Sequence, residues 1–178
     1  MDSSRWRRPY PAALLRRSHA LRFSRLDTGA WTPPRTIATG NNWFVNWADH
    51  PSISALADGT LVAHWLVNNP GKSGSYGYGI RIARSADRGE TWREVFKAGL
   101  DNGSDYSGFV ALLPEARGFS AVYLHPAAPA PTAPAGGHEM EHTKVLRLAR
   151  FGADASLVSD TIVDPDVCTC CNTSMVMT

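Results

Sequence analysis

The octapeptide from Ser85 to Trp92 is the feature of the sequence that most constrains the fold. Asp87 can accept hydrogen bonds from the backbone amides that follow it, and Gly89 can adopt the positive φ that a tight turn requires. The segments on either side, residues 78–84 and 91–96, alternate between apolar and polar side chains with the two-residue period of a half-buried strand. The octapeptide therefore predicts a tight turn between two antiparallel strands.

This pattern, Ser-x-Asp-x-Gly-x-Thr-Trp, resembles the Asp box, the repeated turn of sialidases and related β-propellers of the BNR-repeat type. All of its defined positions match, namely Ser85, Asp87, Gly89, Thr91 and Trp92. In that family the box lies on the rim of a blade, away from the chemistry. The resemblance therefore implies a propeller architecture and a structural role for these five residues, and it says much less about activity.

Strand-like segments repeat along the chain in sets of four. Ser54-Ala55-Leu56 and Val110-Ala111-Leu112 occupy equivalent places in two sets and are 56 residues apart. The sets are a half blade at 20–40, a blade at 51–97, a blade at 107–163 and the start of another at 172–178. With the Asp-box resemblance, this predicts an all-β fold: an incomplete sialidase-type β-propeller with about two and a half four-stranded antiparallel blades, out of six when complete.

Two and a half blades cannot close into a ring, and an open propeller leaves sheet edges uncovered. The chain is therefore expected to be part of a longer product, or to use partner chains for the remaining blades. No apolar run approaches the length of a membrane span, and residues 12–15 are too short for the apolar core of a signal peptide. Export of the full-length protein to the periplasm or cell exterior is still the expectation, with its true start outside this chain.

The basic character of the chain belongs to its first residues. Residues 1–25 contain seven arginines and one aspartate, a net charge of +6, within a chain whose formal net charge is +2. The sequence predicts a basic, poorly ordered leader at 1–19, followed by the propeller domain at 20–178. An arginine-rich segment can contact nucleic acid, but this one lacks interleaved aromatic residues, so no nucleic-acid partner is predicted.

In a propeller, the segments that lead into each first strand open together on one face, where ligands bind. Asp49-His50-Pro51 stands where sialidases carry an Arg-Ile-Pro motif, whose arginine binds the carboxylate of sialic acid. An aspartate there would repel that substrate. Asp49 is a candidate general acid with His50 beside it, although a sugar-hydroxyl acceptor or a cap of the strand start fits equally well. The candidate substrate-binding residues are Asn46, Trp47 and Tyr106, the last two as platforms for a sugar.

Two clusters of potential metal ligands stand out. His138-Glu139-Met140-Glu141-His142 matches the H-E-x-x-H pattern of zinc peptidases, which requires a helix, whereas the flanking sequence favours loop and strand. Cys168, Cys170 and Cys171 are the only cysteines of the chain. They are candidates for a disulfide in an oxidising compartment or for zinc or copper, with His138 or His142 as a further ligand. No cofactor is required by the rest of the sequence.

The run from Val167 to Thr173 also resembles a Cys-x-Cys-Cys segment of bacterial sialidase-like proteins of unassigned activity. The resemblance implies that the tyrosine nucleophile of true sialidases, its glutamate partner and the other two family arginines would lie beyond residue 178 of this sequence. The functional expectation is therefore a sialidase-like Asp-box protein and candidate exo-glycosidase that acts on sialic-acid-type or other glycans. The alternatives are an exported propeller that binds a carbohydrate, another small molecule or a metal without catalysis, and a zinc metallopeptidase.

Overall fold

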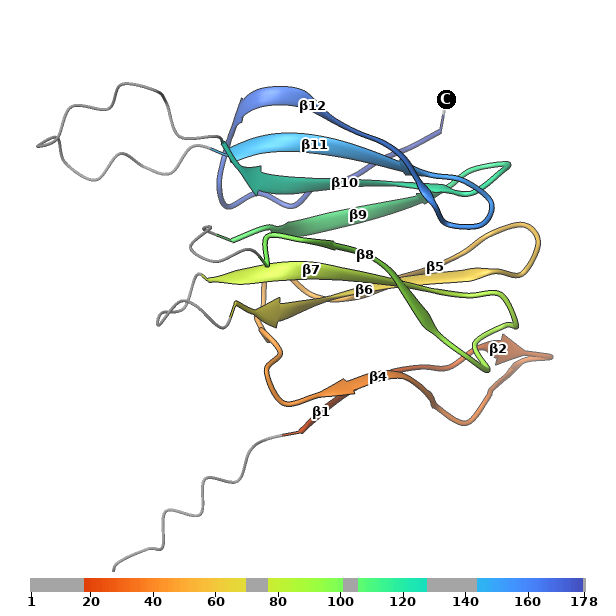
Figure 1. The fold of residues 1–178 in the computed structure, drawn as a ribbon. Coiled ribbons are helices and arrows are strands. Elements are labelled where there is room, and N and C mark those ends of the chain that lie inside the picture. Colours follow the sequence, from red (N-terminus) through yellow and green to blue (C-terminus); the bar gives the residue numbers. More distant parts are fainter. Residues whose placement is uncertain (1–17, 70–76, 101–105, 128–143, 178) are drawn as a thin grey trace, which may run out of the picture.

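The computed structural model describes residues 18–69, 77–100, 106–127 and 144–177, which form antiparallel strands and no helix. The predicted all-β class is confirmed. Two sheets have four strands each, ordered along the sheet as along the chain (Figure 1). The first consists of β5 (Ser52–Ala55), β6 (Leu61–Asn68), β7 (Tyr78–Ser85) and β8 (Arg93–Ala98). The second consists of β9 (Gly108–Pro114), β10 (Phe119–Pro126), β11 (Lys144–Phe151) and β12 (Leu157–Val167).

Two short pairs of strands precede these sheets. β1 (His19–Phe23) pairs with β4 (Arg35–Gly40), and β2 (Leu26–Asp27) pairs with β3 (Ala30–Trp31). Pro33 and Pro34 separate β3 from β4, because proline offers no amide hydrogen to a strand ladder.

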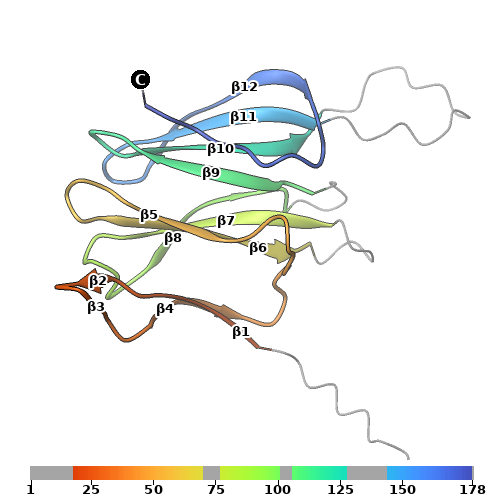
Figure 2. The ribbon, with the colours of Figure 1, turned by 180° about the vertical axis from the view of Figure 1, so that it is seen from behind.

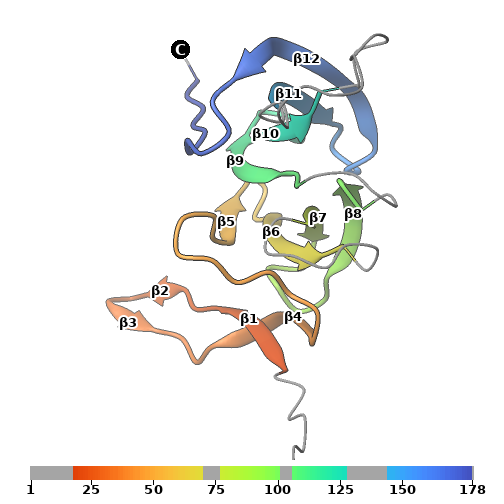
Figure 3. The same cartoon turned by 90° about the vertical axis from the view of Figure 1, so that its left-hand side faces the viewer.

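The first four-stranded sheet is covered on both faces. Alternate residues of β6 and β7, such as Val62 and Ile80, pack in a core shared with Phe119 and Phe151 of the second sheet. The intervening residues of β6, such as Trp65, pack instead with Phe23 and other residues of β1 and β4. Residues 61–67 are consequently all buried, which explains their near-continuous apolar sequence. The three layers stack with β5 beside β9 (Figure 3).

The two large sheets share an internal feature that the sequence analysis missed. At the start of β5, Ser52 lies opposite His64 of β6, with 2.9 Å between the serine Oγ and the histidine Nδ1. Immediately before β9, Ser107 Oγ lies 2.7 Å from Nδ1 of His125 on β10. Each sheet thus begins with a serine and histidine pair across its first two strands, which supports the internal repeat.

The octapeptide turn forms as predicted, with Asp87 at its centre. Its carboxylate accepts hydrogen bonds from the Thr91 amide and hydroxyl and from the Ser85 hydroxyl, at 2.6 to 2.9 Å. These bonds, those from Thr91 above all, hold the pKa of Asp87 well below its usual range. Gly89 has φ +89°, and the Trp92 ring meets Phe23 of β1 edge to face at 5.9 Å. The turn therefore also anchors the N-terminal strands to the first large sheet.

The strand predicted at 172–178, as the start of another blade, is not formed. Residues 172–177 have no regular secondary structure, because the described residues contain no further strand with which they could pair. The chain after β12 instead turns back and reaches β9 (Figure 2), where the Thr173 hydroxyl donates a hydrogen bond to the Phe109 carbonyl. This return places the segment after the cysteines next to the beginning of the second sheet.

Candidate functional site

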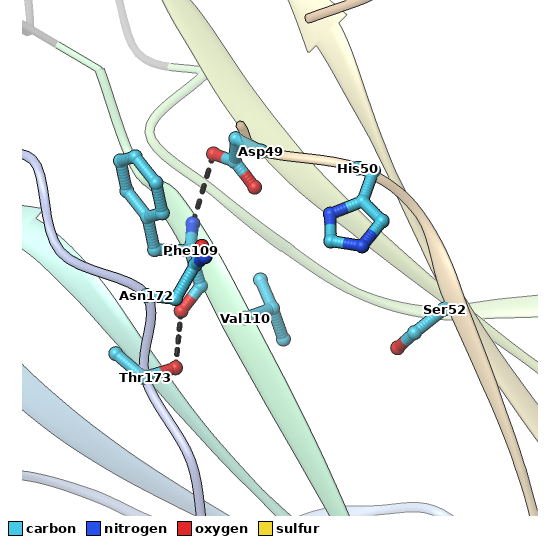
Figure 4. Close-up of a pocket in the computed structure, with 7 residues that line it drawn as sticks. All are labelled: Asp49, His50, Ser52, Phe109, Val110, Asn172 and Thr173. Carbon is cyan, nitrogen blue, oxygen red and sulfur yellow. Dashed lines mark hydrogen bonds between the residues drawn. The ribbon is translucent and has the colours of Figure 1, made fainter. Parts of the chain in front are cut away.

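A cavity of about 200 Å³ lies where three separate segments of the chain meet (Figure 4). The segments are residues 49–52 leading into β5, residues 109–110 at the start of β9, and residues 172–173 after β12. The lining residues are Asp49, His50, Ser52, Phe109, Val110, Asn172 and Thr173. The predicted catalytic candidates Asp49 and His50 therefore lie in one cavity with Asn172.

Asp49 links the two large sheets as well as lining the cavity. It is only 3% exposed, and its Oδ2 accepts hydrogen bonds from the Phe109 amide at 2.9 Å and the Tyr78 hydroxyl at 3.2 Å. Burial raises the pKa of the Asp49 carboxyl, and the two hydrogen bonds and nearby His50 oppose that shift only in part. No described residue is hydrogen-bonded to Oδ1, which points away from Phe109 (Figure 4).

A β-bulge at the start of β9 turns the Phe109 amide toward Asp49. Gly108 pairs with Leu124 and Ala111 with Val122, so that Phe109 and Val110 together face the single residue Tyr123. Phe109 has φ +51°, which is rare for a residue with a bulky side chain. A Cβ atom at Gly108 would lie 2.1 Å from Asp49 Oδ2, so the close approach of the carboxylate requires glycine there.

The bulge also accounts for the spacing of the repeat. Ser52 and Ser107, which occupy the same place in their sheets, are 55 residues apart. Ser54 and Val110 are 56 residues apart, one more, because the bulge inserts one residue into β9. The strained residue Phe109 therefore lines the cavity, and the first sheet has no equivalent bulge at the matching position in β5.

The polar groups of the cavity suit a neutral ligand rich in hydroxyl groups. Asp49 Oδ1 is an acceptor, and the side chains of His50, Ser52 and Asn172 are exposed at the rim with both donors and acceptors. Phe109 and Val110 provide an apolar wall. The residues that line the cavity include no lysine or arginine, so the described site offers no fixed cation to a carboxylate or phosphate.

The three predicted substrate-binding residues lie in different surroundings. Asn46 accepts a 2.7 Å hydrogen bond from the Ala48 amide, which shapes the segment before β5. Trp47 is 94% exposed and lies outside the cavity lining. Tyr106 is a core residue: it is 7% exposed, stacks on Tyr78 at 5.0 Å and lies 3.7 Å below the Lys144 ammonium group. This burial does not fit a sugar platform at Tyr106, whose ring instead packs edge to face on Phe109 of the cavity lining at 6.3 Å.

The three cysteines converge after the end of β12. Their Sγ atoms all lie within 4.8 Å of one another, and all three side chains are exposed and free. They could hold a metal ion. His138 and His142, the other predicted ligands, lie outside the described residues, as does the remainder of the H-E-x-x-H segment.

Comparisons of the chain with protein-family models, with curated proteins and with solved structures found no match. Among the described residues, no helix is long and apolar enough to cross a membrane.

Proposed function

We propose that this chain is a segment of an Asp-box β-propeller of the sialidase type. We further propose that the cavity beside Asp49 binds a neutral, hydroxyl-rich ligand such as one sugar unit of a glycan. The observation that carries the proposal is the meeting of three chain segments, from before β5, from the start of β9 and from after β12, around one cavity. Propeller ligand sites are built in this way, by segments that lead into successive blades.

Three features support the propeller architecture. Both large sheets are four-stranded meanders, their first strands β5 and β9 are neighbours, and the first sheet is covered on both faces. The turn from Ser85 to Trp92 follows β7, which runs parallel to β5 within its sheet. The turn therefore lies at the opposite end of the sheet from Asp49, as expected for an Asp box on the outer rim, away from the ligand.

The cavity favours a neutral sugar over sialic acid. Sialic acid carries a carboxylate, and a site without a lysine or arginine gives that group no charged partner, while the Asp49 carboxylate would repel it. Neutral sugar hydroxyls, in contrast, can donate to Asp49 Oδ1 and exchange hydrogen bonds with Asn172 and Ser52. Phe109 and Val110 can pack against the apolar face of a sugar ring.

Glycoside hydrolysis is the second candidate, and the raised pKa of Asp49 is the observation that favours it. A buried carboxyl that keeps its proton to higher pH can serve as a general acid. Most glycosidases, however, use two carboxyl groups across the scissile bond, and Asp49 is the single carboxyl group among the residues that line this cavity. One of its oxygens is also engaged by Phe109 and Tyr78, so binding without hydrolysis is the primary proposal.

The test is isothermal titration calorimetry of the purified protein with a panel of neutral and sialylated oligosaccharides. We expect binding of a neutral glycan that weakens about tenfold or more in Asn172→Ala, since one or two hydrogen bonds at about 1 kcal/mol each are lost. Asn172 is exposed and is not a member of the described core clusters. Asn41→Ala, which changes an exposed asparagine outside the cavity, is the matched control and should bind as the wild type does.

The same panel separates the two candidates. Release of a fluorophore from a glycoside by the wild-type protein, abolished in Asp49→Asn, would establish hydrolysis in place of simple binding. Affinity that is equal in wild type and Asn172→Ala, or a preference for sialylated glycans, would overturn the assignment of the cavity to a neutral sugar.

A further inference from the structure

The three cysteines form a compact group of soft ligand atoms. Cys168 Sγ lies 3.2 Å from Cys170 Sγ and 3.3 Å from Cys171 Sγ. These separations are far longer than the roughly 2.05 Å of a disulfide bond, so the sulfurs are three independent donors. They line no part of the cavity beside Asp49, so any role of this cluster is separate from ligand binding there.

The loop of residues 168–171, which carries the three cysteines, is held in place by hydrogen bonds between its own segment and buried residues of the core. The Tyr106 hydroxyl donates a hydrogen bond to the carbonyl of Thr169, and the Thr173 hydroxyl donates one to the carbonyl of Phe109. Before the loop, Val167 pairs with Lys144 in the ladder between β12 and β11. The convergence of the sulfurs is therefore fixed by residues of the second sheet, which reduces the ordering cost of binding an ion there.

We propose that Cys168, Cys170 and Cys171 form a three-thiolate site for Cu(I). Thiolates select soft cations, and Cu(I) is satisfied by three sulfur ligands. Structural zinc sites are four-coordinate, but among the described residues no histidine or carboxylate joins the three sulfurs within 4.8 Å. On binding, three copper–sulfur bonds form, each remaining thiol proton passes to solvent, and copper stays in the +1 state, so that no oxidant or reductant is needed.

The experiment uses the full chain, reduced and kept under nitrogen, with Cu(I) supplied as its coloured bicinchoninate complex. We expect the protein to withdraw one Cu(I) per chain, and X-ray absorption of the loaded protein to report three sulfur neighbours. Each of Cys168→Ser, Cys170→Ser and Cys171→Ser should weaken binding by at least about tenfold. Because the cysteines are exposed, these variants should keep the wild-type circular dichroism spectrum.

Ser174→Ala is the matched control, since it changes an exposed residue of the same segment and leaves the sulfurs in place. It should bind copper as the wild type does. Copper withdrawal no greater than that of a triple Cys→Ser variant would overturn the proposal, as would nitrogen neighbours in the absorption spectrum or displacement of copper by equimolar zinc. A disulfide role would be indicated by protein that, isolated without reductant, exposes one reactive thiol and binds no copper after reduction. None of these readouts depends on glycan binding, so the two proposals stand or fall separately.

Discussion

The backbone amide of Phe109 donates a 2.9 Å hydrogen bond to the carboxylate of Asp49, which precedes it by 60 residues. The bond joins the segment before β5 to the bulge at the start of β9, and Tyr78 of β7 completes the link through its hydroxyl. One buried carboxylate therefore fixes the two large sheets relative to each other and forms a wall of the cavity between them.

Asp49→Ala should destabilise the protein by about 2 kcal/mol, because the buried Phe109 amide and Tyr78 hydroxyl lose their acceptor. Asp49→Asn retains an oxygen acceptor and should cost less. Chemical denaturation of both variants at one pH measures the difference. Equal destabilisation by alanine and asparagine would contradict the hydrogen-bonding role, since only the charge would then matter.

The raised pKa of Asp49 also predicts a pH dependence. A carboxyl whose pKa is raised in the folded state favours folding most below its unfolded value of 3.8, and this contribution declines as pH rises through the folded pKa. The free energy of unfolding of the wild type, relative to that of Asp49→Asn, should therefore fall as pH increases from about 3 to neutrality. A difference that rises with pH would show that the pKa is lowered instead.

The contribution of Asp87 to stability should depend on pH in the opposite direction. Its pKa is depressed by hydrogen bonds from Thr91 and Ser85, so its contribution to stability is present above pH 3.8 and is lost as pH falls through the folded pKa. Asp87→Ala should lower the melting temperature at pH 7, and the gap between variant and wild type should narrow in strong acid. A gap that is unchanged by acid would mean that the carboxylate charge is not used in the turn.

The burial of His64 predicts that the protein loses stability in mild acid. It is 1% exposed, and burial lowers its pKa to about 4 from the ordinary 6.5. The unfolded chain therefore binds a proton more readily, and stability should decline as pH falls from about 6.5 to 4, by on the order of 3 kcal/mol in total. In His64→Gln this decline should be smaller. Denaturation curves across that range test the prediction, and an identical pH profile in both proteins would contradict it.

Gly89 and Gly29 provide a matched comparison for the turn from Ser85 to Trp92. Both have positive φ, +89° and +86°, but a Cβ atom at Gly89 would lie 2.2 Å from the Phe23 ring, whereas at Gly29 it would meet nothing within 4 Å. Gly29→Ala should cost about 1 kcal/mol of backbone strain, and Gly89→Ala should cost that strain and the contact with Phe23 in addition. Thermal melts of the two variants give the comparison. Equal losses would show that the turn does not pack tightly on β1.

The strands and turns of the two sheets could be predicted from the sequence because their signals are local. Period-2 alternation marks β7, a near-continuous apolar run marks β6, and Asp87 and Gly89 specify the turn. Every such inference depended on residues close in sequence or on a regular repeat.

The features that the sequence did not predict depend on contacts between distant residues. The link from Asp49 to Phe109 requires a bulge with an unusual φ, which no residue type marks. The burial of Tyr106 depends on Tyr78 and Lys144, and the pairing of Ser52 with His64 depends on strand register. The segment after the cysteines follows β9 without forming a strand, because it has no partner strand in the described chain.

The most direct test of the account is a crystal structure of the protein with its best-binding neutral sugar. The account predicts sugar density in the cavity, with a hydroxyl group within hydrogen-bonding distance of Asp49 Oδ1 and a second contact at Asn172. Sugar density at another position, such as the exposed Trp47, together with an empty cavity beside Asp49, would contradict it.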